Sequence, residues 1–461
     1  MLSPTVAENN AKKQFYNLTL FSLTVILVIA IEIEKTHFSL VALVDDFIII
    51  GACYLLLFLF LYYFRSEILD VPRKTAFILG LTILFVSVTK VVVTSADINL
   101  IYIIPFALIP ILITTFYDVR LALFIHLITL MLCCHMIKEP YNYIFINLAA
   151  GIAAIISLSD INRKYKLLFS SLVITLVYMI VYPATIIHRT GSLSSITISE
   201  FKYFLVNGFL IFTAYPIITL FEKKFYFLSD TTMLELSDSR HPLLQRLSEE
   251  APGSYQHSLQ VANLAEAASR VIGANVLLAR TGALYHDIGK ILHPEYFIEN
   301  QKGERNPHLD LDACESSRII LNHVVEGVKL AETYKLPVQI IDFIRTHHGT
   351  TKAYYFYKKY LAAKNLKRGD EKLFEYLGPK PFSREMAIVM MADAVEAASR
   401  TLDKYTEENI AQIIDSAIML QEQDEQYADS PLTFRNITQI KSAFKTRLME
   451  IYHARIAYPV G

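Results

Sequence analysis

The stretch Ala283-Leu-Tyr-His-Asp-Ile-Gly-Lys290 is the segment around which the C-terminal half of the chain is organised. It joins an imidazole and a carboxylate, His286 and Asp287, at the end of an apolar run with helical spacing. Five more side chains of metal-ligand type surround this pair in the sequence: His257, His323, His347, His348 and Asp393. Imidazoles and carboxylates together suit first-row divalent metals. The sequence therefore predicts a centre for two metal ions, of the kind that hydrolyses phosphate esters.

Helical periodicity places these residues on apolar faces. His257 recurs with Val261 and Leu264, at spacings of four and seven that share one face of a helix. Asp393 lies in a similar apolar setting, and Glu396, one turn later, either supports the site or faces solvent. A buried ionisable group needs a partner or a metal. Each histidine taken alone fits an ordinary hydrogen-bonded core residue, whereas the seven together favour metal binding.

Hydrophobicity divides the 461-residue chain into two unlike halves. Nearly all long apolar runs lie before Glu222, at about residues 15–33, 47–64, 75–93, 98–116, 119–137, 143–158, 166–187 and 201–221. Most reach the roughly 20 residues that cross a bilayer, and the run at 143–158 is short. We expect a transmembrane domain of about eight helices at residues 1–225, a connector at 226–250, and a helical domain at 251–461.

Basic residues gather in alternate loops of the membrane half. They are Lys12 and Lys13; Arg65, Arg73 and Lys74; Arg120; Arg163, Lys164 and Lys166; Lys223 and Lys224. Positive loops stay inside, so eight spans place both termini and the C-terminal domain in the cytoplasm of a multi-pass protein. Membrane lipid, in the inner or plasma membrane of the cell, is one expected partner. The formal net charge of −1 gives no basic field for a nucleic acid polymer.

Two prolines, two histidines and one lysine within the apolar runs are expected to shape the helices or to bind partners. Pro105 is expected to kink the fourth span and Pro183 the seventh. His126 and His135 lie nine positions apart in the fifth run. Ligand binding and proton sensing are open to both histidines, and hydrogen bonding between helices is the commoner role. Lys90, near the outer end of the third span, is expected to extend its ammonium group toward the interface.

The C-terminal domain is predicted to be all-α. Periodic runs predict helices at about 254–271, 275–288, 312–334, 337–347, 353–364, 384–402, 406–422 and 435–454. Ser254 is the predicted N-cap of the helix that carries His257, and Gly289 suits a helix C-terminus. The polar loop at residues 297–308 is expected to border the site, and the loop at residues 365–381 is expected to lie beside it.

Six longer motifs in the chain resemble those of a known protein family. They read Ala251-Pro-Gly-Ser-Tyr-Gln-His257, Tyr285-His-Asp-Ile-Gly-Lys290, Tyr296-Phe-Ile-Glu-Asn-Gln301, Asn306-Pro-His308, His347-His-Gly-Thr350 and Ala392-Asp-Ala-Val-Glu-Ala-Ala-Ser-Arg400. The chain resembles the seven-transmembrane-receptor HD group of the HD superfamily of metal-dependent phosphohydrolases, closely at residues 226–402. That group includes the PgpH-type cyclic di-AMP phosphodiesterases. Its members usually carry a large extracellular domain between the first two spans, where this chain has only residues 34–46.

The resemblance implies hydrolysis of cyclic di-AMP to linear pApA with two divalent metal ions, iron or manganese. One ion would be held by His257, His286, Asp287 and Asp393, and the other by His323, His347 and His348, with Asp287 shared between them. The resemblance further implies that Asp287 is catalytic and that Lys290 acts in catalysis beside a phosphate group of the substrate. The alternative for Lys290 is a solvated lysine after a helix end.

Three alternative functions can be weighed on the residues. Cyclic di-GMP enzymes of the HD type carry Gly-Tyr-Pro after the paired histidines, and here Gly-Thr-Thr follows His348. Guanosine tetraphosphate hydrolases carry two acidic residues after the His-Asp pair, where this chain has Gly289 and Lys290. A membrane receptor that only binds a nucleotide predicts missing ligands, and the sequence lacks none. Adenine rests on the resemblance alone, so another cyclic nucleotide is the alternative substrate.

Overall fold

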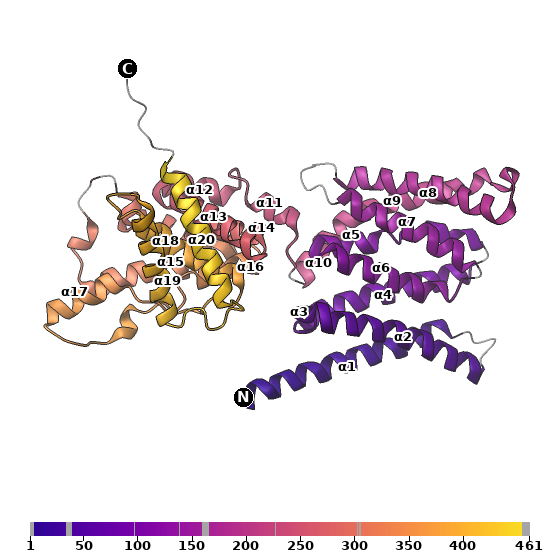
Figure 1. Cartoon of the computed structure of the whole chain (residues 1–461), viewed down its shortest axis with the longest axis horizontal. Coiled ribbons are helices and arrows are strands. Elements are labelled where there is room, and N and C mark those ends of the chain that lie inside the picture. Colours follow the sequence, from indigo (N-terminus) through magenta and orange to yellow (C-terminus); the bar gives the residue numbers. More distant parts are fainter. Residues whose placement is uncertain are drawn as a thin grey trace, which may run out of the picture. The chain divides into compact units, whose positions relative to one another are not determined.

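The computed structural model describes residues 4–453 apart from 34–38, 96, 138, 159–165, 226, 302, 304 and 305. It divides into two compact units, Met1–Phe227 and Leu228–Gly461, which Figure 1 colours from indigo to yellow along the chain. The described residues form helices and one isolated bridge between Lys352 and Glu375. The expected all-α fold class, a transmembrane helix bundle followed by a helical domain, is confirmed.

The first unit is a bundle of long apolar helices. Its helices are α1 (Pro4–Glu32), α2 (Leu40–Phe64), α3 (Ser66–Leu69), α4 (Pro72–Val93), η1 (Ile98–Ile103), α5 (Leu108–Phe116), α6 (Val119–Cys134), α7 (Pro140–Leu158), α8 (Lys166–Thr190), η2 (Leu193–Ser195), η3 (Ile198–Glu200), α9 (Phe201–Leu210), η4 (Ile211–Thr213) and α10 (Ala214–Phe225).

Seven segments of the described chain are long and apolar enough to cross a membrane, by length and composition. The run at 143–158, expected to be short, extends back to Pro140 and gives α7 a length of 19 residues. Proline fits the first turn of a helix, where its missing N–H has no partner anyway. The short element is α6, an apolar helix of 16 residues that packs on α4 and α7 (Figure 1). The count of eight spans stays a prediction.

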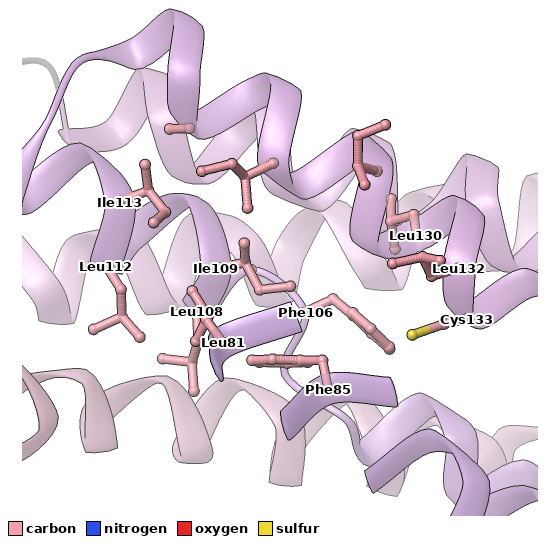
Figure 2. Packing of buried hydrophobic residues seen from close by; sticks show 14 of the residues in the cluster. Leu81, Phe85, Phe106, Leu108, Ile109, Leu112, Ile113, Leu130, Leu132 and Cys133 are labelled. Atoms are coloured by element: carbon pink, nitrogen blue, oxygen red, sulfur yellow. The ribbon is translucent and has the colours of Figure 1, made fainter. Parts of the chain in front are cut away.

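Side chains inside the first unit are closely packed. Figure 2 shows Phe85 of α4, Ile109 of α5 and Leu130 of α6 around a shared interior, and all three are buried. Apolar side chains also lie on the outside of the bundle: Leu55 is 57% exposed and Ile156 is 66% exposed. An apolar exterior of this kind suits a helix bundle solvated by lipid tails.

The break at Pro105 is repaired by a side chain. Pro105 lies between η1 and α5, as predicted, because proline cannot donate a helical hydrogen bond. Asn207 of α9 donates through Nδ2 to the carbonyl oxygens of Tyr102 and Ile104, at 2.9 Å each. Backbone groups at membrane depth need such partners, since no water replaces them. Pro183, in contrast, lies inside α8, which continues through it.

The second unit is also helical. Its α-helices are α11 (Asp230–Leu236), α12 (Pro242–Glu250), α13 (Pro252–Ile272), α14 (Val276–Tyr285), α15 (Ala313–Thr333), α16 (Val338–Thr346), α17 (Tyr354–Lys364), α18 (Arg384–Ser399), α19 (Glu407–Gln423) and α20 (Phe434–His453). Short 3-10 turns are η5 (Ile288–Leu292), η6 (Pro294–Tyr296), η7 (Ile298–Asn300), η8 (Pro307–Leu309) and η9 (Glu371–Phe374). The central helices are α13 and α18, which pack on each other.

Two predictions about helix ends in this unit were wrong. The N-cap of α13 is Ala251 rather than Ser254, and no side chain of its own caps the helix. Instead Asn300 accepts hydrogen bonds from the backbone N–H groups of Gly253 and Ser254, at 2.8 and 3.1 Å. Gly289 does not cap α14, which ends at Tyr285.

Gly289 permits a close helix approach instead. A Cβ atom at this position would lie 1.8 Å from the carbonyl oxygen of His323 on α15. The absent side chain therefore lets the η5 turn lie directly against α15. This contact holds the end of α14 beside His323.

Candidate metal centre

The structure brings all seven predicted ligand residues together inside the second unit. They come from five helices: His257 from α13, His286 and Asp287 from the end of α14, His323 from α15, His347 and His348 from the end of α16, and Asp393 from α18. Their ligand atoms form two groups, each with members within 4.8 Å of one another. The first group is Asp287, His323, His347 and His348, and the second is His257, His286 and Asp393.

Asp287 faces both groups, one with each carboxylate oxygen. Its Oδ1 lies 3.3 Å from His323 Nε2 and 3.6 Å from His347 Nε2. Its Oδ2 lies 3.2 Å from His286 Nε2 and 3.6 Å from His257 Nε2. The side chain is almost completely buried. This geometry would allow one carboxylate to be shared between two cations.

Three of the histidines are held in the same tautomer by the backbone. The Nδ1 atoms of His286, His323 and His347 each donate to the carbonyl oxygen three residues earlier, at 2.7, 2.5 and 2.7 Å. At helix ends such carbonyls have no helical partner, so His286 and His347 also complete α14 and α16. With the proton on Nδ1, each Nε2 presents a lone pair to the centre.

These lone pairs face one another, which fits a bound cation. His323 Nε2 and His347 Nε2 lie 3.2 Å apart. When each ring carries its one proton on Nδ1, neither of these two Nε2 atoms carries a proton. Burial lowers the pKa of His347 to about 4, which keeps it neutral. Asp287 Oδ1 and His286 Nε2 are buried without a hydrogen-bond partner in the described chain. A buried polar group needs a partner, and a metal ion between these atoms would supply it.

His257 is oriented by Glu396 of α18. Its Nδ1 lies 2.5 Å from Glu396 Oε2, which directs Nε2 toward Asp393 Oδ1 at 2.9 Å. The other carboxylate oxygen of Glu396 accepts two hydrogen bonds from Arg400, at 2.8 and 2.6 Å. Glu396 is only 4% exposed, so the solvent-facing alternative is excluded. A carboxylate behind a metal-binding histidine fixes the ring and increases its basicity.

The electrostatics of the site favour positive charge at its centre. Burial raises the pKa of Asp393, but hydrogen bonds from His257 and His286 outweigh this and hold the pKa well below its usual range. Burial lowers the pKa of His286, but the charge of Asp287 outweighs this and raises the pKa to about 10, so the site favours a positive charge at Nε2, where a metal ion would replace the second proton. Both carboxylates therefore stay ionised, and they attract the positive charge that divalent ions would bring.

Lys290 lies inside the site rather than in solvent. Its Nζ lies 2.7 Å from Asp287 Oδ2 and 2.8 Å from Glu299 Oε1. The ammonium group also lies 4.9 Å from the centre of the Phe297 ring. Glu299 in turn accepts a hydrogen bond from Ser254 Oγ at 2.9 Å. The polar loop that was expected to border the site does so, but its composition did not identify Glu299.

His348 is the most exposed of the seven residues. Its side chain is 26% exposed, whereas the side chain of His347 is fully buried. The ring of Tyr376 lies against it, with ring centres 4.2 Å apart. Tyr376 lies 28 residues after His348, within the loop at residues 365–381 that we expected beside the site, although no local pattern singled out this residue. His348 is therefore the predicted ligand that solvent reaches most easily.

Comparison with known proteins agrees with this geometry. Residues 40–229 match the family model "7TM receptor with intracellular HD hydrolase", and residues 254–398 match the model of the HD domain. The two halves of the chain are thus similar to the two parts of the seven-transmembrane-receptor HD family. HD domains bind divalent metals, and the two groups of ligand atoms here could hold such ions. With its seven long apolar helices and its match to a seven-transmembrane model, the chain is a multi-pass membrane protein.

Two curated proteins are similar to the chain over most of its length. The chain is 37% identical over 376 residues to the cyclic-di-AMP phosphodiesterase PgpH of Bacillus subtilis (strain 168), covering 78% of this chain and 52% of that protein. For PgpH of Listeria monocytogenes the identity is 38% over 315 residues, covering 68% of this chain and 44% of the relative. The chain thus spans about half the length of the curated relatives it matches.

A solved structure is also similar. The crystal structure of the HD domain of L. monocytogenes PgpH, in complex with cyclic di-AMP, is 42% identical in sequence with a TM-score of 0.45. The match covers 47% of this chain and all of the crystallised domain.

Proposed function

We propose that this chain is a membrane-bound phosphodiesterase that hydrolyses cyclic di-AMP to linear pApA, and thereby controls the level of this second messenger. The observation that carries the proposal is Asp287, whose two oxygens face two separate groups of ligand atoms. The substrate is supported by the two curated relatives, both named cyclic-di-AMP phosphodiesterases.

The centre would hold two divalent ions, iron or manganese, because its imidazoles and carboxylates suit first-row metals. One ion would be held by His257, His286, Asp287 and Asp393, and the other by His323, His347 and His348, with Asp287 shared. Bound in this way, such ions supply a water nucleophile at neutral pH and neutralise charge on the phosphoryl group.

The remaining residues would act on the substrate and on the ligands. Lys290 places a buried ammonium group next to Asp287, where it can attract a phosphate oxygen of the substrate. Glu299 holds the ammonium group in this position from the opposite side. Tyr376 would keep the His348 ring at the entrance. Asp287 and Lys290 are therefore the residues to which we assign catalytic roles.

The catalytic unit would lie in the cytoplasm, with eight spans and both termini on that side. The alternating basic loops support this topology. The match to the seven-span family model begins at residue 40, so α1 precedes it. Seven segments, including the short α6, then lie within residues 40–229, and α1 makes eight. Reporter fusions after residue 13 and at the C-terminus test this topology, and a signal from outside at either position would refute it.

Turnover of a dinucleotide panel tests the activity. The full chain, purified in detergent, should convert cyclic di-AMP to pApA with manganese or iron, and a chelator should stop the reaction. His286→Ala should lose turnover, whereas His293→Ala should retain it, because the side chain of His293 is 52% exposed and lies outside the centre. Faster turnover of cyclic di-GMP would favour an HD phosphohydrolase of another specificity. Tight binding of cyclic di-AMP without hydrolysis would favour a nucleotide-binding receptor.

A further inference from the structure

A second group of ligand-type side chains lies in the membrane unit. Glu32 is the last residue of α1, Asp46 lies in the second turn of α2, and His135 follows the last residue of α6. One ligand atom from each lies within 4.8 Å of the others. His135 Nε2 lies 2.9 Å from Asp46 Oδ1 and 3.8 Å from Asp45 Oδ2. His126, which lies within α6, instead forms a hydrogen bond with the backbone carbonyl of Asn147 in α7. This is the hydrogen bonding between helices that was expected as the commoner role.

The three side chains line a cavity of about 280 Å³. A water molecule takes roughly 30 Å³ of liquid volume, so the cavity has room for an ion that keeps several waters. Lys90 also lines it, together with Ser39 and apolar side chains. The cavity is thus polar where the three helix ends meet.

Glu32 is the residue that points to a ligand. It is only 6% exposed, and neither of its carboxylate oxygens has a hydrogen-bond partner among the described residues. The nearby Lys90 donates instead to the backbone carbonyl of Glu32, at 2.7 Å. A carboxylate at a helix C-terminus also opposes the helix dipole. A buried charge without a partner is costly, so this carboxylate fits a cation better than it fits a purely structural role.

The donor set has the charge and chemistry for a divalent metal. Two carboxylates, Glu32 and Asp46, neutralise a dication, and the imidazole of His135 adds a nitrogen donor. One imidazole with two carboxylates is a combination that suits zinc or manganese, with water completing the coordination. An ion there would tie α1, α2 and α6 together at one end of the bundle.

We propose that Glu32, Asp46 and His135 bind a divalent transition-metal ion, separate from the metal centre of the HD domain. The site lies at the C-terminal end of α4, next to Lys90. The chain leaves the membrane unit at the other end of α4, where the ring of Phe227 packs 5.1 Å from that of Phe77. With the topology proposed above, the ion would therefore bind from outside the cell, although the binding itself does not depend on that topology.

Counting metal ions tests the site. The full chain, stripped with a chelator in detergent and dialysed against manganese or zinc, should bind one ion per chain more than its Glu32→Gln variant. The variant keeps the size of the side chain and removes its charge. Glu139→Gln is the matched control, because Glu139 follows α6 closely in sequence but its side chain is 62% exposed. It should bind as many ions as the unmodified chain.

A second variant keeps the test independent of one substitution. His135→Asn should also lose this ion, with a fall in affinity beyond the roughly 10–100-fold that is usual for residues that only orient a ligand. Added metal should raise the melting temperature of the unmodified full chain more than that of either variant. Equal ion counts in the unmodified chain and in Glu32→Gln would overturn the proposal. Turnover of cyclic di-AMP is measured in parallel, so failure of the HD centre would appear separately.

Discussion

Glu396 offers the sharpest test of how the metal centre is held. In Glu396→Gln the amide oxygen can still accept from His257 Nδ1, but the negative charge is lost and the amide nitrogen cannot accept the two hydrogen bonds from Arg400. A hydrogen bond to a charged group contributes roughly 1.5–3 kcal/mol, about twice the value for a neutral one. The loss is therefore about 1–1.5 kcal/mol, or roughly tenfold in affinity. We expect the ion beside His257 to bind about tenfold more weakly and the other ion to be unaffected.

The assay is turnover of cyclic di-AMP across a manganese titration. The half-activating concentration should rise about tenfold in Glu396→Gln, and saturating metal should restore most of the maximal rate. Glu266→Gln is the matched control, because Glu266 also pairs with arginines but lies away from the centre. Such surface pairs contribute little, so its metal dependence should not change.

Two results would contradict this reasoning. An unchanged metal dependence in Glu396→Gln would show that the contact with His257, at 2.5 Å, does not tune the ligand. A loss of turnover that excess manganese cannot restore, in a variant with unaltered melting temperature, would mean that Glu396 acts in the reaction rather than through the metal.

Three further substitutions probe separate features of the unit. Asp287→Ala should abolish turnover and release metal while the domain stays folded; near-normal turnover with unchanged metal content would exclude a shared carboxylate. Asp393→Ala should lower the affinity for one ion and leave the other bound, as metal analysis of the purified variant would show; two tightly held ions and normal turnover would refute its role as a ligand. Gly289→Ala should destabilise the protein by about 1–3 kcal/mol, because its Cβ would overlap the His323 carbonyl; an unchanged melting temperature would refute the close approach.

The helices were predictable because their signals are local. Apolar spacing placed the helices of the second unit within a few residues, from α13 to α20. The same spacing indicated that His257, His323 and Asp393 face inward, and all three are buried. Periodicity requires only neighbours along the chain, so one sequence is enough to read it.

What the sequence could not supply were pairings between distant segments. Asn300 caps α13 from a position 46 and 47 residues away, so the nearby Ser254 was the wrong candidate. Glu396 meets His257 across 139 positions, and spacing alone left its role undecided. Glu299 lies in η7, a 3-10 turn too short to show periodicity, and only the folded chain places its carboxylate on Lys290. Each of these contacts depends on tertiary packing, which local patterns do not encode.

The adjacency of histidine and aspartate at the end of α14 has a geometric reason. The ending helix leaves a free carbonyl at Ala283, which takes the Nδ1 proton of His286 and directs its Nε2 inward. Asp287 starts the next turn, and Gly289 allows that turn to press against α15. Only this approach brings Asp287 Oδ1 within 3.3 Å of His323 Nε2 while Oδ2 stays beside His286. A side chain at the glycine position would therefore separate the two groups of ligands, even though it would meet the backbone of His323 and not its imidazole.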